Sequence, residues 1–316
     1  MTAAKGKRVL FAVTSPYGVS RSALDKATRL ASALNAELEL FYRAFDSDVI
    51  HPQGTAPHHT TGNIEAYVER RREILSALAE ELRATGLRTS AHVAWNTRSD
   101  EGILAEVSRW QPDFLVIEAF PRSPDDGVLS YQTHHKLMQA CPCPLLLVRN
   151  ALPYPSHPRV LAAVDPMHSH AKTPELDQAI VSAASVVADA LAGDLHLFHA
   201  RVPWAEISNQ LHGPSWIPDI VKDENQVRYE HLVAALVTEL AKGHNVPDLR
   251  SHLVDGDVRD CLPAFTRAES IDIVAIGILS RSFLQRLMIG DTARSLLGDL
   301  ECDVLIVKQP GFHAEP

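Results

Sequence analysis

The sequence predicts an α/β protein made of two tandem, doubly wound, five-stranded parallel sheets. Short runs of apolar, often β-branched residues alternate with segments of helical periodicity, which is typical of strands that helices cover on both faces. The same order of strands then occurs a second time after a proline-rich segment. Because the order and the spacing are both kept, we interpret the chain as an internal duplication.

Five pairs of segments support the duplication. The first pair is RVLFAVT from Arg8 and RVLAAVD from Arg159. The others are AELELFY from Ala36 with GDLHLFH from Gly193, SAHVAW from Ser90 with RSHLVD from Arg250, PDFLVI from Pro112 with IDIVAI from Ile271, and CPLLLV from Cys143 with CDVLIV from Cys302. We therefore expect the halves to superpose, each with the strand order 3-2-1-4-5.

The first half, residues 1–150, is predicted to alternate strands and helices, with a long loop at Ala44–Gly62. Ser20 is a plausible cap for the first helix, because a serine hydroxyl accepts from the amides of a first turn. The predicted strands are Arg8–Thr14, Glu37–Tyr42, Arg88–Trp95, Phe114–Glu118 and Leu145–Val148, and the predicted helices are Ser20–Leu34, Ile64–Thr85, Glu101–Trp110 and Tyr131–Ala140.

A stiff linker is predicted at residues 151–158, because Leu152–Pro158 contains three prolines. The second half, residues 159–316, contains a long helix at Asp223–Gly243 that corresponds to the long helix of the first half. Its strands at 272–277 and Val304–Val307 flank a loop and a further helix. Leu145–Val148 and Val304–Val307 are each short, apolar and last in their half, so we expect them to be edge strands that pair or pack against each other.

Charge and composition exclude several classes of function. The net charge of −9 and the lack of a basic run argue against nucleic acid or an anionic membrane as a partner. No apolar run reaches the length of a membrane span, and the N-terminus lacks the features of a leader, so we expect a cytoplasmic protein. The four cysteines fit a reducing compartment. Cys141 and Cys143 lack a second pair to complete a zinc site, so core cysteines are expected.

Neither a catalytic motif nor a metal-binding pattern is present. The sequence has no nucleophile elbow and no HExxH, so no catalytic residue is assigned and the protein is not expected to be an enzyme beyond weak ATP hydrolysis. His168 and His170 lie beside Asp165, but this group lacks a closed ligand set. His196 and His199 are three apart on one strand and are expected on opposite faces. No metal site is therefore predicted.

The segment from Asp272 to Lys308 runs from a strand ending at Gly277 through a loop to Gly290, a helix and CDVLIVK. A duplicated five-stranded unit with this ending resembles the tandem universal stress proteins, and the resemblance covers essentially the whole chain. The first half resembles the E-type tandem proteins in Thr133–Leu137, before Cys-Pro-Cys-Pro. The resemblance implies a role in stress survival and two halves packed as a pseudo-dimer, with a possible homodimer. It also implies adenine-nucleotide binding where the glycine motif is kept.

The glycine motif of nucleotide-binding members is a glycine, two residues, a glycine, nine residues, then a glycine and a small hydroxyl residue. Here Gly277 and Gly290 fit, whereas Ser280 replaces the second glycine and Asp291 the hydroxyl residue. The resulting candidate site, for ATP with Mg²⁺, comprises Asp165, Ala200, Gly277, Ser280, Gly290, Asp291 and Thr292.

Asp291 decides between two interpretations of this half. As a helix cap it stabilises by ~1 kcal/mol, but beside a phosphate it repels by up to roughly 4 kcal/mol. A divalent cation that bridges Asp165 or Asp291 to the phosphates reverses the sign of that interaction. The alternative is a former nucleotide site whose glycines are kept only for packing.

The first half is interpreted as having lost any nucleotide site. Its loop Ala119–Gly127 contains prolines where a phosphate loop needs free amides, and two aspartates of the wrong charge. Its first strand ends in Thr14 instead of aspartate. A cavity between the strand ends and Ala44–Gly62 is a candidate site for a small apolar metabolite. The main hypothesis is a ligand-responsive binding or scaffold module, with ATP binding in the second half or metabolite binding in the first as alternatives.

Overall fold

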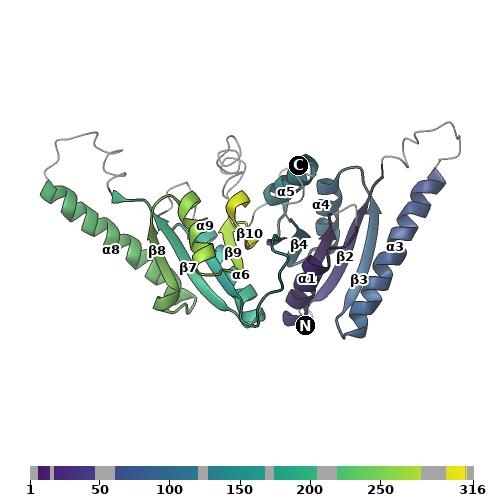
Figure 1. Ribbon diagram of the computed structural model, residues 1–316, viewed down its shortest axis with the longest axis horizontal. Helices are drawn as coiled ribbons and strands as arrows, with labels where there is room; N and C mark the ends of the chain where they lie inside the picture. Colours follow the sequence, from purple (N-terminus) through teal and green to yellow (C-terminus); the bar gives the residue numbers. More distant parts are fainter. Residues whose placement is uncertain are drawn as a thin grey trace. The chain divides into compact units, whose positions relative to one another are not determined.

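The computed structural model describes residues 6–14, 18–46, 61–119, 127–167, 174–204, 219–278, 297–309 and 311. The chain divides into two compact units, here called unit 1, which extends to Tyr154, and unit 2, Pro155–Phe312. Each unit is built around a parallel sheet with helices on its faces (Figure 1).

The sheet of unit 1 has the strand order β3-β2-β1-β4-β5, which is the predicted 3-2-1-4-5. All of its neighbouring strands are parallel. The strands are β1 Arg8–Val13, β2 Glu37–Ala44, β3 Thr89–Trp95, β4 Phe114–Glu118 and β5 Leu145–Val148. Strands β4 and β5 are buried along their whole length, as expected for strands covered on both faces.

The helices of unit 1 bury apolar stripes against this sheet. Ser20 caps the first of them as predicted, since its hydroxyl accepts a hydrogen bond from the amide of Ala23. The helices are α1 Arg21–Ala33, α3 Thr61–Ala84, α4 Ser99–Trp110 and α5 Gly127–Ala140. Helix α1 packs on the central strands, whereas α3 runs along β3 (Figure 1). The core therefore lies on both sides of the sheet.

Unit 2 repeats this arrangement, with the strand order β8-β7-β6-β9-β10 and parallel pairing throughout. Its strands are β6 Arg159–Ala163, β7 Asp194–Arg201, β8 Ser251–Asp255, β9 Ile273–Gly277 and β10 Asp303–Val307. Its helices with both ends in the described residues are α6 Pro174–Ala190, α8 Asp219–Gly243 and α9 Val258–Ala268, and a 3₁₀ turn, η2, lies at Asp248–Arg250.

The duplication extends to individual contacts. The backbone amide of Arg8 donates to Asp113 Oδ2 at 2.7 Å, and that of Arg159 donates to Asp272 Oδ2 at 2.8 Å. Three matched turns adopt the same left-handed backbone conformation, at Asn35 and Ala192, at Gln111 and Ser270, and at Gly86 and Asn245. The two halves therefore share one fold in their turns as well as in their strands, as the repeated segments predicted.

The largest corrections to the predicted boundaries concern the starts of α5 and α8, since α8 begins at Asp219 and not at the predicted Asp223. The sequence analysis placed Gly127 in a loop and began the helix at Tyr131, whereas α5 begins at Gly127. Helix α3 likewise begins at Thr61 instead of Ile64, and Thr14 lies just beyond β1. Gly127 is a residue type that marks turns more often than helix starts, so the sequence pattern did not place the start of α5 there.

The beginning of the linker is attached to unit 1. Lys26 on α1 donates to the backbone oxygen of Asn150 at 2.7 Å, and its ammonium lies 4.4 Å from the centroid of the Tyr154 ring. Arg29 donates to the backbone oxygen of Tyr154 at 2.7 Å. These contacts bury Tyr154, so the proline-rich segment is anchored on α1 up to this residue.

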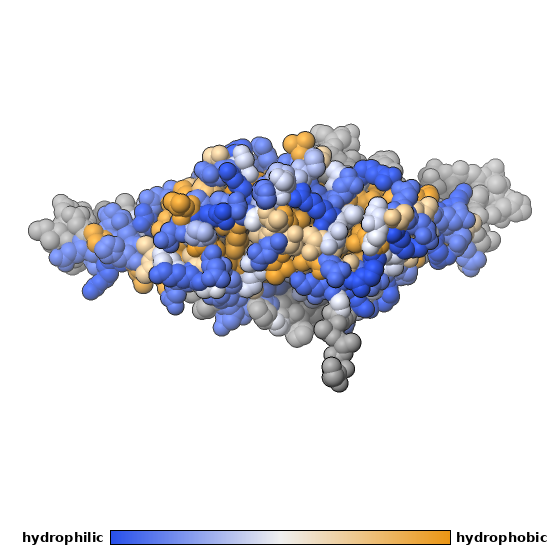
Figure 2. Space-filling model, turned by 90° about the horizontal axis from the view of Figure 1, so that it is seen from below, coloured by the Kyte–Doolittle hydropathy of each residue, from blue (hydrophilic) through white to orange (hydrophobic). Residues whose placement is uncertain are grey.

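On the face drawn in Figure 2, hydrophilic residues predominate, and hydrophobic residues appear in several groups between them. The most exposed large apolar residues in the described ranges include Leu152 and Leu249. Scattered exposed leucines are normal in globular proteins and need no partner to explain them. Among the described helices, none is both long and apolar enough to span a membrane.

Candidate functional site

Open parallel sheets bind ligands at the carboxyl ends of their strands. The strand pairings show which residue of unit 2 corresponds to each residue of unit 1 at this edge. In β1 and β2, Arg8 pairs with Glu37, and in β6 and β7, Arg159 pairs with Asp194. Counting along the strands from these pairs gives three equivalent positions at the carboxyl edge. They are Thr14 and Asp165, Arg43 and Ala200, and Glu118 and Gly277.

Asp165 is held at the end of β6 by its backbone. Its amide donates to Asp177 Oδ1 at 3.1 Å, and Asp177 is a buried residue of α6. The preceding carbonyl, of Val164, lies 3.0 Å from His199 Nδ1, which is therefore the protonated ring nitrogen of that histidine. The side chain of Asp165 is partly exposed. A fixed backbone with a partly exposed carboxylate suits a group that contacts a ligand.

Tyr229 on α8 lies close to this edge. Its hydroxyl donates to the backbone oxygen of Val202 at 3.2 Å, and its ring centroid lies 5.8 Å from that of Trp204. Burial raises the pKa of Tyr229, the nearby Arg201 opposes the rise, and the carboxylates of Asp165 and Asp255 add to it. Through its contact with Val202, which follows β7, Tyr229 adds an aromatic surface at the carboxyl end of that strand.

Arg201, at the end of β7, is engaged by a carboxylate. Its guanidinium donates to the two oxygens of Asp255 at 2.6 and 3.0 Å, in the paired geometry that makes such contacts strong. This pair lowers the pKa of Asp255. The guanidinium of Arg201 is therefore paired with Asp255, and Arg201 is not assigned as a phosphate ligand.

Ala200 occupies the position that Arg43 holds in unit 1, and the two differ in how they fill the edge. Arg43 donates to Ser99 Oγ at 2.5 Å and to the backbone oxygen of Asn96 at 3.4 Å. A Cβ atom at Gly102 of α4 would lie 2.9 Å from Cγ of Arg43, so the glycine makes room for the arginine. In unit 2 the position of Gly102 is taken by Cys261. Unit 1 thus closes this part of its own edge with a side chain that unit 2 lacks.

Gly277 ends β9 as predicted, but packing already explains why it is a glycine. A Cβ atom there would lie 2.7 Å from Cδ1 of Ile180 and 3.0 Å from Leu176, both on α6. The next amide, of Ile278, donates to the backbone oxygen of Val307 at 3.0 Å. That amide belongs to the sheet, so the described part of the glycine motif offers helix packing in place of a phosphate cradle.

The remaining predicted nucleotide residues, Ser280, Gly290, Asp291 and Thr292, lie outside the described residues, as do His168 and His170. Within the described ranges, no group of three or more histidine, cysteine or acidic residues is arranged to hold a metal ion. The two histidines of β7 have different neighbours, since His196 Nδ1 lies 3.1 Å from His252 Nε2 and His199 contacts Val164.

The carboxyl edge of unit 1 carries cations and aromatic rings. The guanidinium of Arg71 lies 5.0 Å from the centroid of Tyr42 and 5.2 Å from that of Tyr67. The rings of Tyr67 and Trp95 meet edge to face at 6.1 Å. Burial, together with Tyr67, raises the pKa of Tyr42 to about 12. The alternative of a small apolar metabolite placed the ligand between these strand ends and Ala44–Gly62, and residues 47–60 of that loop lie outside the described residues. The described part of the lining is a packed cluster of arginine and tyrosine.

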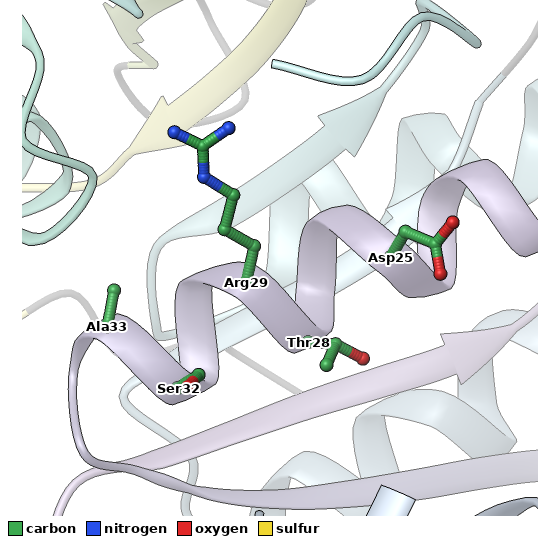
Figure 3. Close-up of a pocket in the computed structure, with 5 residues that line it drawn as sticks. All are labelled: Asp25, Thr28, Arg29, Ser32 and Ala33. Atoms are coloured by element: carbon green, nitrogen blue, oxygen red, sulfur yellow. The ribbon is translucent and has the colours of Figure 1, made fainter. Parts of the chain in front are cut away.

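An open depression of about 440 Å³ lies along α1 of unit 1 (Figure 3). It is lined by Asp25, Thr28, Arg29, Ser32 and Ala33. A neighbouring depression is lined by α1 and by the turns that precede β2 and β3. Both lie toward the amino ends of the strands and contain none of the predicted site residues.

Sequence reasoning missed Arg43, Gly102 and Glu118, which distinguish the two edges. The signal was present one residue beyond the matched segments, where AELELFY continues into Arg43 and GDLHLFH continues into Ala200. Extending the repeat to the ends of the strands would have found the difference, because position within a strand fixes which face a side chain occupies.

Residues 6–149 and 157–308 each match the universal stress protein family. The curated relatives include "Universal stress protein E" of Photorhabdus laumondii, 22% identical over 306 residues, and that of Escherichia coli, 22% identical over 305 residues. These alignments cover 96% of this chain, and 96% and 95% of the two relatives.

Solved structures of the same fold span both halves. A functionally unknown protein from Pseudomonas aeruginosa superposes with a TM-score of 0.71 at 22% identity, covering 96% of this chain and 93% of that chain. A universal stress protein from Archaeoglobus fulgidus superposes with a TM-score of 0.62 at 15% identity, covering 96% and 99%. With two matches that together span nearly the whole sequence, the chain belongs to the universal stress protein family and carries two of its domains in tandem.

Proposed function

We propose that this chain is a ligand-responsive module of the stress response, and that unit 2 is the half that binds an adenine nucleotide. The nucleoside end of the ligand is assigned to the carboxyl ends of β6 and β7, beside Asp165 and Ala200. The observation that carries the proposal is the exchange of Arg43 for Ala200 at equivalent positions. Arg43 closes the edge of unit 1 through its contacts with α4, and a methyl group replaces it in unit 2.

The neighbouring groups are suited to a nucleoside. A carboxylate accepts hydrogen bonds from ribose hydroxyls or from an exocyclic amine, and Asp165 is partly exposed on a fixed backbone. Tyr229 and Trp204 supply aromatic surface at the carboxyl end of β7. The proposal assigns Mg²⁺ to the phosphate end, where it would offset the negative charge of the aspartates. No catalytic residue is assigned, so any hydrolysis of ATP is proposed to be slow and incidental.

The repeat itself supplies the experiment. The double substitution Ala200→Arg with Cys261→Gly places in unit 2 the arginine and glycine that close unit 1, and Cys261→Gly alone is the matched control. ATP is titrated calorimetrically into the three proteins with and without Mg²⁺, and circular dichroism checks that each is folded. We expect wild type and Cys261→Gly to bind, and the double variant to bind at least about tenfold more weakly, which corresponds to about 1.4 kcal/mol.

Two results would count against the proposal. Equal affinity of the double variant and wild type would move the nucleotide away from the carboxyl end of β7. If wild type binds no ATP under either condition, the nucleotide proposal fails, and a scaffold role without this ligand becomes the better account of the family fold.

A further inference from the structure

Two thiols meet where α5 ends and β5 begins. Cys141 directly follows α5, and its amide still donates to the backbone oxygen of Leu137 at 2.8 Å, as in a helix. Pro142 cannot continue this pattern, because it has no amide hydrogen, and the chain turns toward β5. The turn brings Sγ of Cys141 to 3.6 Å from Sγ of Cys143. Neither cysteine is in a disulfide, so both sulfurs are at the thiol level.

We propose that Cys141 and Cys143 form an oxidisable dithiol, a modification site that closes to an intramolecular disulfide when the protein meets a hydroperoxide. A disulfide holds its sulfur atoms about 2.05 Å apart, so the two sulfurs must approach by roughly 1.5 Å. Two side chains one residue apart make that approach by turning about their own bonds, without moving α5 away from β5.

The reaction balances with the hydroperoxide as its only co-reactant. The thiolate of one cysteine attacks the outer peroxide oxygen, breaks the O–O bond and becomes a sulfenic acid, while an alcohol or water leaves. The second thiol attacks the sulfenic sulfur and forms the S–S bond, and water leaves with the thiol proton. Two electrons pass from the two sulfurs to the peroxide, and an external thiol reverses the change by exchange.

The two cysteines differ in burial, and this difference suggests which of them takes part in each step. Cys143 is less buried than Cys141, so the proposal has the peroxide react first at Cys143 and Cys141 resolve the sulfenic acid. The hydrogen bond with Cys141 and burial raise the pKa of Cys143 well above its ordinary value. Since the thiolate is the nucleophile, closure should be slow at neutral pH and accelerate as the pH rises. This behaviour fits a site that responds to sustained oxidant.

The pair differs from the other two cysteines. Cys302, immediately before β10, is buried, and Cys261 lies on α9, where its thiol is directed at the backbone oxygen of Asp255 at 3.5 Å. Cys302 occupies the same place in unit 2 as Cys143 in unit 1, but its chain has Leu300 where unit 1 has Cys141. The dithiol is therefore particular to unit 1, and the duplication provides the comparison.

The experiment uses the full-length chain and hydrogen peroxide. Trypsin cleaves after Lys136 and Arg149, so both thiols fall in one peptide, LMQACPCPLLLVR, and a bridge appears as the loss of two hydrogen atoms from it. The reduced protein is oxidised at pH 7 and pH 8.5, remaining thiols are alkylated, and peptides are identified by mass. We expect the bridged peptide to dominate, to form several-fold faster at the higher pH, and to revert with dithiothreitol.

Variants separate this site from general oxidation. Cys261→Ser with Cys302→Ser leaves only the pair and should form the bridge at the wild-type rate, whereas Cys143→Ser should not form it. If Cys143→Ser does not fold, the double variant still decides the question. Oxidation of the double variant to sulfinic acid without a bridge would overturn the proposal. So would a bridge from Cys141 or Cys143 of wild type to either of the other cysteines.

Discussion

Glu39 and Glu106 form a carboxylate pair on the face of the unit 1 sheet that α4 covers. Both side chains are nearly buried, and Arg109 donates to each of them, at 2.6 Å in the case of Glu39. His92 Nδ1 lies 2.7 Å from the other oxygen of Glu106. Burial, and then the hydrogen bond with Glu106, raise the pKa of Glu39 from 4.5 to about 7, whereas the pKa of Glu106 is lowered. At pH values below about 7 the pair therefore holds one proton, and Glu39 carries it.

Unit 1 should lose stability as the pH rises from 4.5 to 7. In this window folded Glu39 keeps its proton and the unfolded chain releases it, so raising the pH favours unfolding. A separation of about 2.5 pH units, at about 1.4 kcal/mol each, sets an upper bound of roughly 3 kcal/mol. Glu39→Gln imitates the protonated acid and should remove this dependence, measured as urea midpoints at pH 5 and pH 7. An unchanged dependence in the variant would assign the effect to other groups.

At the scale of elements, Gly277 illustrates how a strand and a helix are fitted together. Its missing side chain admits Leu176 and Ile180 of α6. Gly277→Ala should destabilise unit 2 by about 1–3 kcal/mol, since an added methyl overfills a packed core. Gly243→Ala, at the end of α8 where nothing lies within 4 Å, is the matched control and should stay within about 0.5 kcal/mol. Chemical denaturation measures both, and equal effects would contradict the packing account.

The sequence predicted the bounds of an element correctly where a run of buried apolar residues marks both of its ends. The bounds of β4 and β5 agree with those predicted, because short apolar runs between polar turns leave little choice of register. The start of α5 was not predictable from periodicity, because Gly127 marks turns more often than helix starts. For the site, Asp165 and Gly277 were found from strand ends and glycines. The role of Arg43 depends on its contacts with Asn96 and Ser99 across the sheet edge, which no local pattern encodes.

At the scale of the whole molecule, equivalent positions of the two units carry an acid in unit 1 and a base in unit 2. His196 in unit 2 is equivalent to Glu39 in unit 1, and His252 is equivalent to His92. The ring centroids of Phe265, on α9, and His252 are 4.7 Å apart. Phe265 occupies the position of Glu106 in unit 1, which contacts His92. The rings of His196 and His252 are stacked, with centroids 5.4 Å apart. Burial, and then His252, Arg250 and Arg159, lower the pKa of His196 to about 4, with Asp194 opposing the change.

The two units should therefore respond to pH in opposite directions. Between pH 6.5 and 4 the unfolded chain binds a proton at His196 that the folded unit excludes, so unit 2 loses stability as the pH falls. Unit 1 gains stability from Glu39 over much of the same interval. The expected result is that the stability of unit 2 falls in acid and that of unit 1 falls toward neutral pH, each by up to roughly 3 kcal/mol.

Hydrogen exchange followed by mass spectrometry measures this in the intact chain, because peptides from β1 and β6 report on each core separately. After correction for the intrinsic effect of pH on exchange, the ratio of protection in β6 to that in β1 should rise between pH 5 and pH 7. His196→Gln should flatten the response of β6 alone, and Glu39→Gln that of β1 alone. A ratio that stays constant in wild type would mean that the acid pair and the histidine pair do not control the stability of their units.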